Sequence, residues 1–415
     1  MSGTATLPVS SQPQEIAATT GHPAARRGAY NLPIGYLRAF ITVLVVAHHA
    51  VLAYTPFAPP AASLLTEPRL WRAFPVVDTH HWSGFGIFTG FNDTFFMALM
   101  FFLSGLFVWE SLERKGTRHF LRDRAVRLGI PFVAAAAVVA PLAYYPAYLQ
   151  TAAPAGVRGY MAVWLSQGDW PAGPAWFLWL LLAFAAMAAG LYALAPGWGD
   201  ALGRLVSRAG QHPGRFYWLL AGTSAAAYLA LILIFDPFRW TTVGPFAFQT
   251  GRLLHYFVYY LAGIAVGAWG LQRGLLSSGG MLARRWLLWM VAAFLAFVAA
   301  SGVFLASISA KSSLGMWTTL GGITFALSCA ASSLAFCALF VRFVNSGSAI
   351  ADSLRDNAYG IYILHYPCVS WLQYALLGAA LSGLVKGVVV TLGAVAISWG
   401  AAAALRRIPA VARVI

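Results

Sequence analysis

Residues 36–54 read YLRAFITVLVVAHHAVLAY, an apolar stretch of spanning length that also holds one arginine and two histidines. A charge near the middle of such a span costs about 2.5–3.5 kcal/mol, so it is rarely without a function. Arg38 and His49 are eleven residues apart, which places them within roughly 20° of one helix face and about 16 Å apart along the axis. His48 points about 80° away from Arg38. One face of the predicted helix therefore carries a fixed charge at one depth and an imidazole at another.

The composition of the chain is that of a membrane protein. Of its 415 residues 60% are hydrophobic and 9% are charged, and the mean hydropathy is +0.70. A soluble protein carries about 25% charged residues. The net charge of +15 is spread over short loops between apolar segments, which argues against a nucleic-acid partner. The three cysteines have no CxxC spacing and fit packing positions.

Ten apolar segments of spanning length predict an all-α integral membrane protein, a bundle of about ten transmembrane helices. The segments are 33–54, 90–111, 127–147, 174–195, 215–235, 252–270, 285–307, 315–341, 357–377 and 383–404. With this division, 19 of the 27 lysines and arginines fall on the side of both termini, seven on the other side, and Arg38 within a span. The positive-inside rule therefore predicts that both termini are cytoplasmic.

Three regions follow from this division. Residues 1–30 are predicted to be a disordered cytoplasmic tail, because they are rich in Ser, Thr, Ala, Pro and Gln and have no apolar core. Residues 31–405 form the transmembrane domain, and 406–415 a short basic cytoplasmic tail. Two predicted outer loops, 55–89 and 236–251, are rich in aromatic residues and proline. They suit either a lid over a pocket or an interfacial aromatic belt.

A basic run follows the second predicted span, from residue 113 to 127. It contains Arg114, Lys115, Arg118, Arg122, Arg124 and Arg127. On a helix, part of this set forms a stripe that either anchors the chain on anionic lipid or binds the phosphates of a nucleotide-bearing donor. Arg38, about 6 Å inside the same face, would extend such a phosphate site inward.

His49 is the candidate catalytic base. The pantetheine arm of coenzyme A is about as long as the Arg38–His49 rise, so a donor held at the inner face would present its thioester near His49. A neutral imidazole there could accept the proton of an attacking hydroxyl. The alternative is a hydrogen-bonded packing histidine. Asp93 is the candidate partner that orients His49, although Asn92 or Asp93 could equally cap the second predicted helix.

Other polar residues carry weaker predictions. Arg252 and His255, near the outer start of the sixth predicted span, are candidates for an acceptor pocket. Tyr359, Tyr362 and His365 recur along one side of the ninth, where core hydrogen bonding is the simpler account of the two tyrosines. No metal site is predicted, because the adjacent histidines of DTHHW (78–82) do not both face one ion in a regular element.

Five segments, taken in order, resemble the acyltransferase type-3 family, especially its branch with glucan biosynthesis protein C and polysaccharide O-acetyltransferases. They are Arg38-x10-His49, FFLSGLFVWE (101–110), RHFLRDRAVRLGIPF (118–132), PAWFLW (174–179) and NAYGIYILHYP (357–367). The resemblance runs from about residue 33 to 404, nearly the whole chain.

The resemblance implies a membrane-bound O-acyltransferase of the bacterial inner membrane. Such an enzyme moves an acyl group, here acetyl or succinyl, from cytosolic acyl-CoA to a hydroxyl at the outer face, usually on a sugar. Acyl-CoA is a co-substrate, and no permanently bound cofactor is implied. His49 matches the family's essential histidine, Arg38 its companion arginine, and the basic run its donor-side motif. By the same match Ser104 is a donor-side candidate and Trp176 a pocket candidate.

One position departs from the family pattern: Ala98 stands where many members have an acidic residue, and Asp93 lies five residues earlier. Two other classes stay open, a transporter with Arg38, His49 and His365 along its pathway and a non-catalytic partner of an envelope complex. The feature that distinguishes the enzyme from a transporter is the basic run at the inner face together with a single histidine deep in the first span, because a transporter does not need this combination. The expected partners are acyl-CoA, a carbohydrate or other hydroxyl acceptor and the lipid bilayer.

Overall fold

The computed structural model describes residues 31–62, 65, 69–168, 170–309 and 314–415, so the predicted tail 1–30 lies outside the described residues. The long helices are α1 (Leu32–Leu52), α2 (Ser83–Gly105), α3 (Val108–Arg124), α5 (Ala140–Leu149), α7 (Trp176–Leu194), α9 (Pro213–Ile232), α10 (Leu253–Trp269), α12 (Trp286–Ser309), α13 (Leu314–Phe343), α14 (Ala349–Ala375) and α15 (Gly383–Leu405). Shorter helices are α4 (Ile130–Ala134), α6 (Val157–Ser166), α8 (Trp198–Leu205), α11 (Met281–Arg284) and α16 (Pro409–Ala412). The 3-10 turns are η1 (Arg69–Arg72), η4 (Gly173–Ala175) and η5 (Thr250–Arg252), and the π-helical turns are η2 (Ala125–Gly129) and η3 (Ala135–Val139).

Eight helical segments of the described part are long and apolar enough to cross a membrane, so the chain is an all-α, multi-pass membrane protein as predicted. The predicted spans 252–270 and 357–377 form helices α10 and α14, which fall outside this group of eight. Helix α10 has only 17 residues, and α14 opens with the polar stretch ADSLRDN. The count of ten spans and the cytoplasmic placement of both termini stay predictions.

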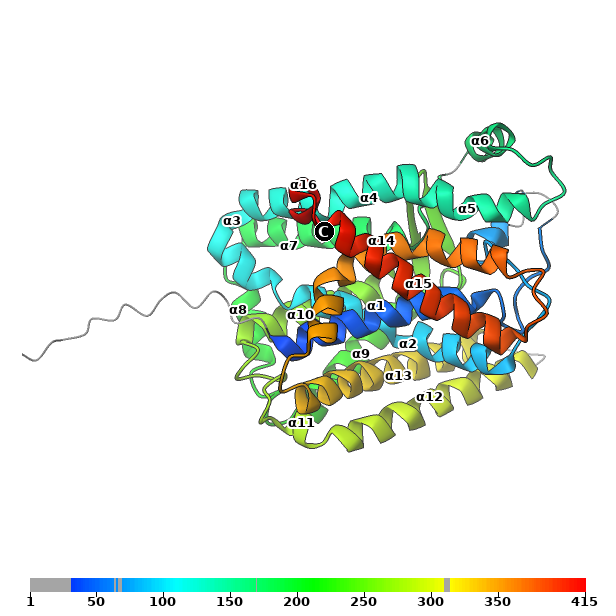
Figure 1. The fold of residues 1–415 in the computed structure, drawn as a ribbon. Helices are drawn as coiled ribbons and strands as arrows, with labels where there is room; N and C mark the ends of the chain where they lie inside the picture. Colours follow the sequence, from blue (N-terminus) through cyan, green and yellow to red (C-terminus); the bar gives the residue numbers. More distant parts are fainter. Residues whose placement is uncertain (1–30, 63–64, 66–68, 169, 310–313) are drawn as a thin grey trace, which may run out of the picture. The chain divides into compact units, whose positions relative to one another are not determined.

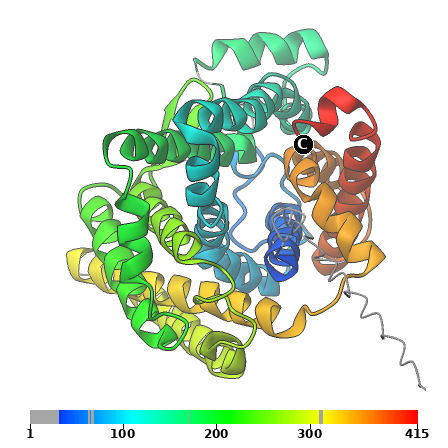
Figure 2. The ribbon, with the colours of Figure 1, turned by 90° about the vertical axis from the view of Figure 1, so that its left-hand side faces the viewer.

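Helix α1 lies inside the bundle. It packs against α2, α13, α14 and α15, and the view along the helices shows it (dark blue) surrounded by other helices (Figure 2). Leu37, Ile41 and Val46 are fully buried. Helix α12 is the opposite case, because it packs mainly on α13 and exposes large apolar side chains such as Phe294 and Leu305. A helix that is apolar all round and exposed in this way faces lipid.

The predicted inner loop at 112–126 is helical rather than irregular. Residues 108–149 form one helical path through α3, η2, α4, η3 and α5, interrupted by a kink at Gly116, whose φ is +68°. The two π-helical turns each insert a wider turn into this path. Figure 1 shows α3 at the same end of the bundle as α8 and α11, which also come from predicted inner loops.

Three glycines let α2 and α10 cross at close range. A Cβ atom on Gly105 would lie 2.3 Å from the Tyr260 carbonyl oxygen, one on Gly263 2.1 Å from that of Phe102, and one on Gly267 2.0 Å from that of Leu106. Gly263 and Gly267 are four residues apart, the spacing of close helix contacts in membranes. Midway along its length α2 is joined to the start of α10 by an ion pair described below.

The described part of the loop 53–82 is fixed to the helices beneath it. Asp78 Oδ2 lies 2.7 Å from Lys386 Nζ of α15, and both side chains are buried. Tyr144 and Tyr366 donate hydrogen bonds to the carbonyl oxygen of Arg72 in this loop. The second predicted outer loop contains the hairpin β1 (Trp240–Val243) and β2 (Phe246–Gln249), with Trp240 opposite Gln249. The Trp179 indole donates to Ala247 O and holds that hairpin on α7.

Candidate active site

Two histidines from distant parts of the chain meet inside the bundle. His49 of α1 and His365 of α14 approach with His365 Nε2 at 3.3 Å from His49 Nδ1 and ring centroids 5.1 Å apart. The Gln373 amide of α14 donates to the carbonyl oxygens of His49 and Ala50, each at 3.0 Å, and so fixes α1 against α14. The pairing makes His365 the direct neighbour of the predicted base.

The hydrogen bonds of the neutral pair assign its protons. His49 Nδ1 lies 2.8 Å from Val45 O, and His365 Nδ1 lies 2.7 Å from Tyr362 O. A carbonyl oxygen only accepts, so each Nδ1 carries the hydrogen and His365 Nε2 presents a lone pair to the His49 Nδ1–H. His49 Nε2 is then the unprotonated nitrogen, as a general base requires.

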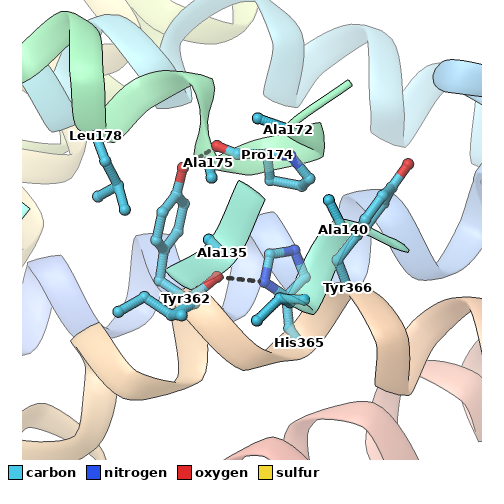
Figure 3. Close-up of a pocket in the computed structure, with 11 residues that line it drawn as sticks. Ala135, Ala140, Ala172, Pro174, Ala175, Leu178, Tyr362, His365 and Tyr366 are labelled. Carbon is cyan, nitrogen blue, oxygen red and sulfur yellow. Dashed lines mark hydrogen bonds between the residues drawn. The ribbon is translucent and has the colours of Figure 1, made fainter. Parts of the chain in front are cut away.

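Two tyrosines of α14 flank the pair. The Tyr366 ring meets the His49 ring edge-on at 5.3 Å. Tyr362 donates its hydroxyl to Pro174 O. Figure 3 shows His365 between these tyrosines, facing a small pocket. For Tyr362 the predicted role in core hydrogen bonding agrees with this contact.

Asp93 has a different partner from the one expected. Its carboxylate makes a bidentate ion pair with Arg252, at 2.9 Å and 2.5 Å, while His49 Nδ1 contacts Val45 and His365. The capping alternative is wrong too, because α2 begins at Ser83, with Trp82 at the N-cap, and Asp93 lies ten residues along it. The predicted start at 90 is too late because the polar, glycine-containing residues 83–89 belong to the helix. Among the described residues, His365 rather than Asp93 is the side chain that contacts the His49 ring nitrogen.

His48 faces away from His365. Its ring packs on Phe96 of α2 with the centroids 5.1 Å apart, and it lies within electrostatic range of Asp93 and Arg252. The two adjacent histidines of α1 thus contact different neighbours, as their separation of about 100° around the helix allows.

A cluster of basic residues from three elements lies toward the other end of α1. Arg124 is within electrostatic range of Arg38 and Arg127, and Tyr359 of α14 is within range of all three. Tyr359 also donates its hydroxyl to Arg127 O. Arg38 and Arg127 are exposed, and Arg124 is half-buried with its guanidinium over the Phe120 ring. The structure therefore joins Arg38 to the end of the basic run, as its predicted depth implies.

The remaining donor-side candidates lie farther along the run or on α2. Four are exposed on α3: Arg114, Lys115, Arg118 and Arg122. Lys115 pairs with Asp123 across the Gly116 kink. Ser104 is half-buried, directly before Gly105 at the crossing of α2 and α10.

The acceptor candidates form two groups on different sides of α1. Arg252 packs over the Phe325 ring, His255 Nε2 lies 3.5 Å from Cys329 Sγ, and Asn92 is buried beside Asp93. Trp176 belongs with this group through its stacking on Tyr256, while Tyr362 and His365 belong to the pair with His49. The structure does not bring all predicted pocket residues into one pocket.

The family match covers this whole arrangement. A family described as an acyltransferase domain matches residues 32–403, from the start of α1 almost to the end of α15. The chain belongs to the acyltransferase type-3 family. Neither the curated proteins nor the solved structures give a significant match. The protein is therefore a membrane acyltransferase, and the enzyme class replaces the transporter and the non-catalytic partner considered from the sequence.

In this acyltransferase, sequence reasoning missed residues that hold the site together. Lys386 was counted only as an outer charge, yet it is fully buried and binds Asp78. A lysine inside a predicted span carries a high free-energy cost, and this feature of the sequence indicates that Lys386 has a buried partner. Lys386 Nζ also lies 3.4 Å from His80 Nδ1, so the DTHHW segment forms an ion-paired clamp. Gln373 and Tyr366 had no comparable signal.

Proposed function

We propose that this protein transfers an acyl group from cytosolic acyl-CoA to a hydroxyl of a sugar or glycan at the outer face of a bacterial inner membrane. The observation that carries the proposal is the contact between His365 of α14 and His49 of α1, the helix that also bears Arg38. It combines a base of defined tautomer with a basic cluster about 16 Å away along one helix.

The donor side rests on the basic cluster. Arg124 lies within electrostatic range of both Arg38 and Arg127, and of Asp123. Arginine forks suit phosphate oxygens, so this cluster would hold the phosphates of coenzyme A, with Arg118 and Arg122 at its exposed edge. The pantetheine arm would then run beside α14 from Tyr359 toward His365.

The chemistry at His49 is general base catalysis. The acceptor hydroxyl oxygen attacks the thioester carbonyl carbon while its proton passes to His49 Nε2. The carbon–sulfur bond then breaks, the ester carbon–oxygen bond remains, and the proton returns to the coenzyme A thiolate. The His49 Nδ1–H, shared by Val45 O and His365 Nε2, keeps the ring oriented and supports the transient imidazolium.

We assign the acceptor side to the group around Asp93 and Arg252, with Trp176 stacked on Tyr256 as its aromatic part. Asp93 keeps 46% of its side chain exposed although it lies midway along a bundle helix. An accessible carboxylate beside aromatic rings suits a polyhydroxylated ligand, since carboxylates accept from sugar hydroxyls and aromatic faces cover apolar ring surfaces.

The test is acyl transfer by the full chain in proteoliposomes, with labelled acetyl-CoA on one side and a panel of sugars on the other. His49→Ala is expected to lose about 10²–10⁴-fold in rate. His212→Ala, which removes an exposed histidine outside both proposed sites, is the control and should keep its activity. Transfer at the normal rate by His49→Ala would overturn the proposal, and movement of an unmodified sugar would favour a transporter.

A further inference from the structure

We infer that the small pocket beside His365 receives the acyl group and admits acetyl but not succinyl or longer chains. The inference rests on the proposed function, because it assigns the acyl end of that same donor. It chooses between the two acyl groups that the sequence left open.

The pocket is walled mostly by small side chains from two segments of the chain. One wall comes from η3 and the start of α5, with Ala135, Val139 and Ala140. The other comes from η4 and α7, with Ala172, Ala175 and Leu178. Figure 3 shows four of these alanines around the His365 ring. Apart from the imidazole and two tyrosines on α14, these walls offer hydrocarbon.

The pocket lies beside the proposed reaction centre, with two residues of α14 between the pocket and His49. His365 and Tyr366 both line it, and both rings contact the His49 ring, at 5.1 Å and 5.3 Å between centroids. Tyr362, another lining residue, lies one helical turn from Tyr359 in the basic cluster. A thioester delivered along α14 would therefore reach His49 with its acyl carbon directed at the alanines.

The walls are fixed before any ligand arrives. Tyr362 is bound to Pro174 O, and Tyr144 and Tyr366 both donate to Arg72 O. Gly173 has φ +54°, and a Cβ atom there would lie 3.1 Å from the Tyr366 ring. The π-helical turn η3 directs Ala135 and Val139 inward. A pocket held at this many points does not expand easily for a larger group.

Size and polarity then decide the acyl group. A methyl group fits among alanines, whereas each added methylene must displace a wall, and one methylene changes selectivity by about 10–200-fold. Succinyl adds two methylenes and a carboxylate, which loses its water against hydrocarbon walls. None of the residues that line the pocket is a lysine or an arginine that could pair with the succinyl carboxylate. Acetyl is the group that meets both conditions.

The test is competition of coenzyme A, acetyl-, butyryl- and succinyl-CoA against labelled acetyl-CoA on the purified full chain. Wild type is expected to bind acetyl-CoA at least about tenfold more tightly than butyryl- or succinyl-CoA. Leu178→Ala enlarges the pocket and should bring butyryl-CoA close to acetyl-CoA. Leu181→Ala removes the same side chain from a buried position of α7 outside the lining, and should leave the ratio unchanged.

Each outcome separates the two proposals. If no coenzyme A compound binds, the donor assignment in the proposed function fails. If all four bind equally to wild type, or if Leu181→Ala changes the ratio as much as Leu178→Ala, the acyl pocket is overturned while the donor assignment stands. Val139→Ala, on the opposite wall, repeats the test if Leu178→Ala does not fold.

Discussion

His365 Nε2 lies 3.3 Å from His49 Nδ1, although the two residues are 316 positions apart in the chain. Val45 O and His365 Nε2 both accept from His49 Nδ1–H and leave Nε2 as the basic nitrogen, so His365 acts through His49 as a positioning residue. His365→Phe keeps a ring of similar size but removes the acceptor. We expect the rate to fall about tenfold or more, but less than the 10²–10⁴-fold loss for His49→Ala.

The kinetic pattern distinguishes this role from simple loss of folding. The basic cluster is untouched and a phenyl ring keeps the bulk of the imidazole in the wall of the proposed acyl pocket, so kcat should fall much more than KM for acyl-CoA rises. His365→Asn restores a side-chain acceptor and should recover part of the rate. Equal rates for the Phe and Asn variants would contradict the positioning role.

The Asp93–Arg252 pair predicts an asymmetric effect of its two single substitutions. The Arg252 side chain is 5% exposed and that of Asp93 46%, so removal of Asp93 leaves a buried, unpaired cation. Breaking a buried pair in this way costs about 3–5 kcal/mol. Arg252→Met leaves a carboxylate that is less enclosed by the protein than the guanidinium, and should cost less.

Thermal unfolding in detergent checks this order. Asp93→Leu should lower the unfolding temperature more than Arg252→Met, and the double variant should be more stable than Asp93→Leu alone. The reverse order for the single variants would show that Asp93, rather than Arg252, is the desolvated partner.

The buried contact between Lys386 and Asp78 predicts an acid-sensitive loop. Burial alone would raise the pKa of Asp78, but hydrogen bonds from Lys386 and His80 outweigh it and hold that pKa below its ordinary 3.8. A carboxyl with a depressed pKa stabilises the fold above its unfolded pKa, and this stabilisation is lost as the pH falls through the folded pKa. The unfolding temperature should therefore drop below pH about 4.

Asp78→Asn should lower stability at pH 7 and flatten this acid decline, whereas Glu113→Gln, an exposed carboxylate of α3, should leave the decline in place. Lys386→Met leaves Asp78 buried without its cation and should cost about 3–5 kcal/mol. An unchanged pH profile in Asp78→Asn would remove Asp78 as the titrating group.

The glycines of the α2–α10 crossing give a further stability test. Gly263→Ala and Gly267→Ala each direct a methyl group at a backbone oxygen, which has no freedom to rotate away. Such overpacking costs about 1–3 kcal/mol or more. Gly222→Ala in α9, with nothing within 4 Å of the added atom, should be neutral or stabilising by about 0.5–1 kcal/mol. Similar losses at Gly222 and Gly263 would rule out close crossing as the cause.

The sequence predicted the helical membrane fold and the shared face of Arg38 and His49, because hydropathy and helix periodicity are local properties. It did not predict the partner of His49, because α14 meets α1 only in three dimensions. Asp93 was given the wrong neighbour because the predicted second span began seven residues after Ser83, the first residue of α2. Lys386 binds Asp78 across 308 positions, a distance at which sequence pattern carries no signal.

The basic cluster predicts a loss confined to donor binding. Arg38→Ala and Arg124→Ala each remove a cation from the proposed phosphate site, and hydrogen bonds to charged groups contribute about 1.5–3 kcal/mol. KM for acetyl-CoA should rise about tenfold or more, with kcat preserved at saturation. Arg38→Lys should recover only part of the affinity, because an ammonium group does not reproduce the two-pronged contact.

The salt dependence of binding gives a second measurement on the same cluster. Added salt should weaken acetyl-CoA binding to wild type more than to Arg124→Ala, because the variant has already lost one of the charge contacts that salt screens. Arg208→Ala, an exposed arginine of another predicted inner loop, is the control and should keep the wild-type KM. Unchanged KM in both Arg38→Ala and Arg124→Ala would move the donor away from this cluster.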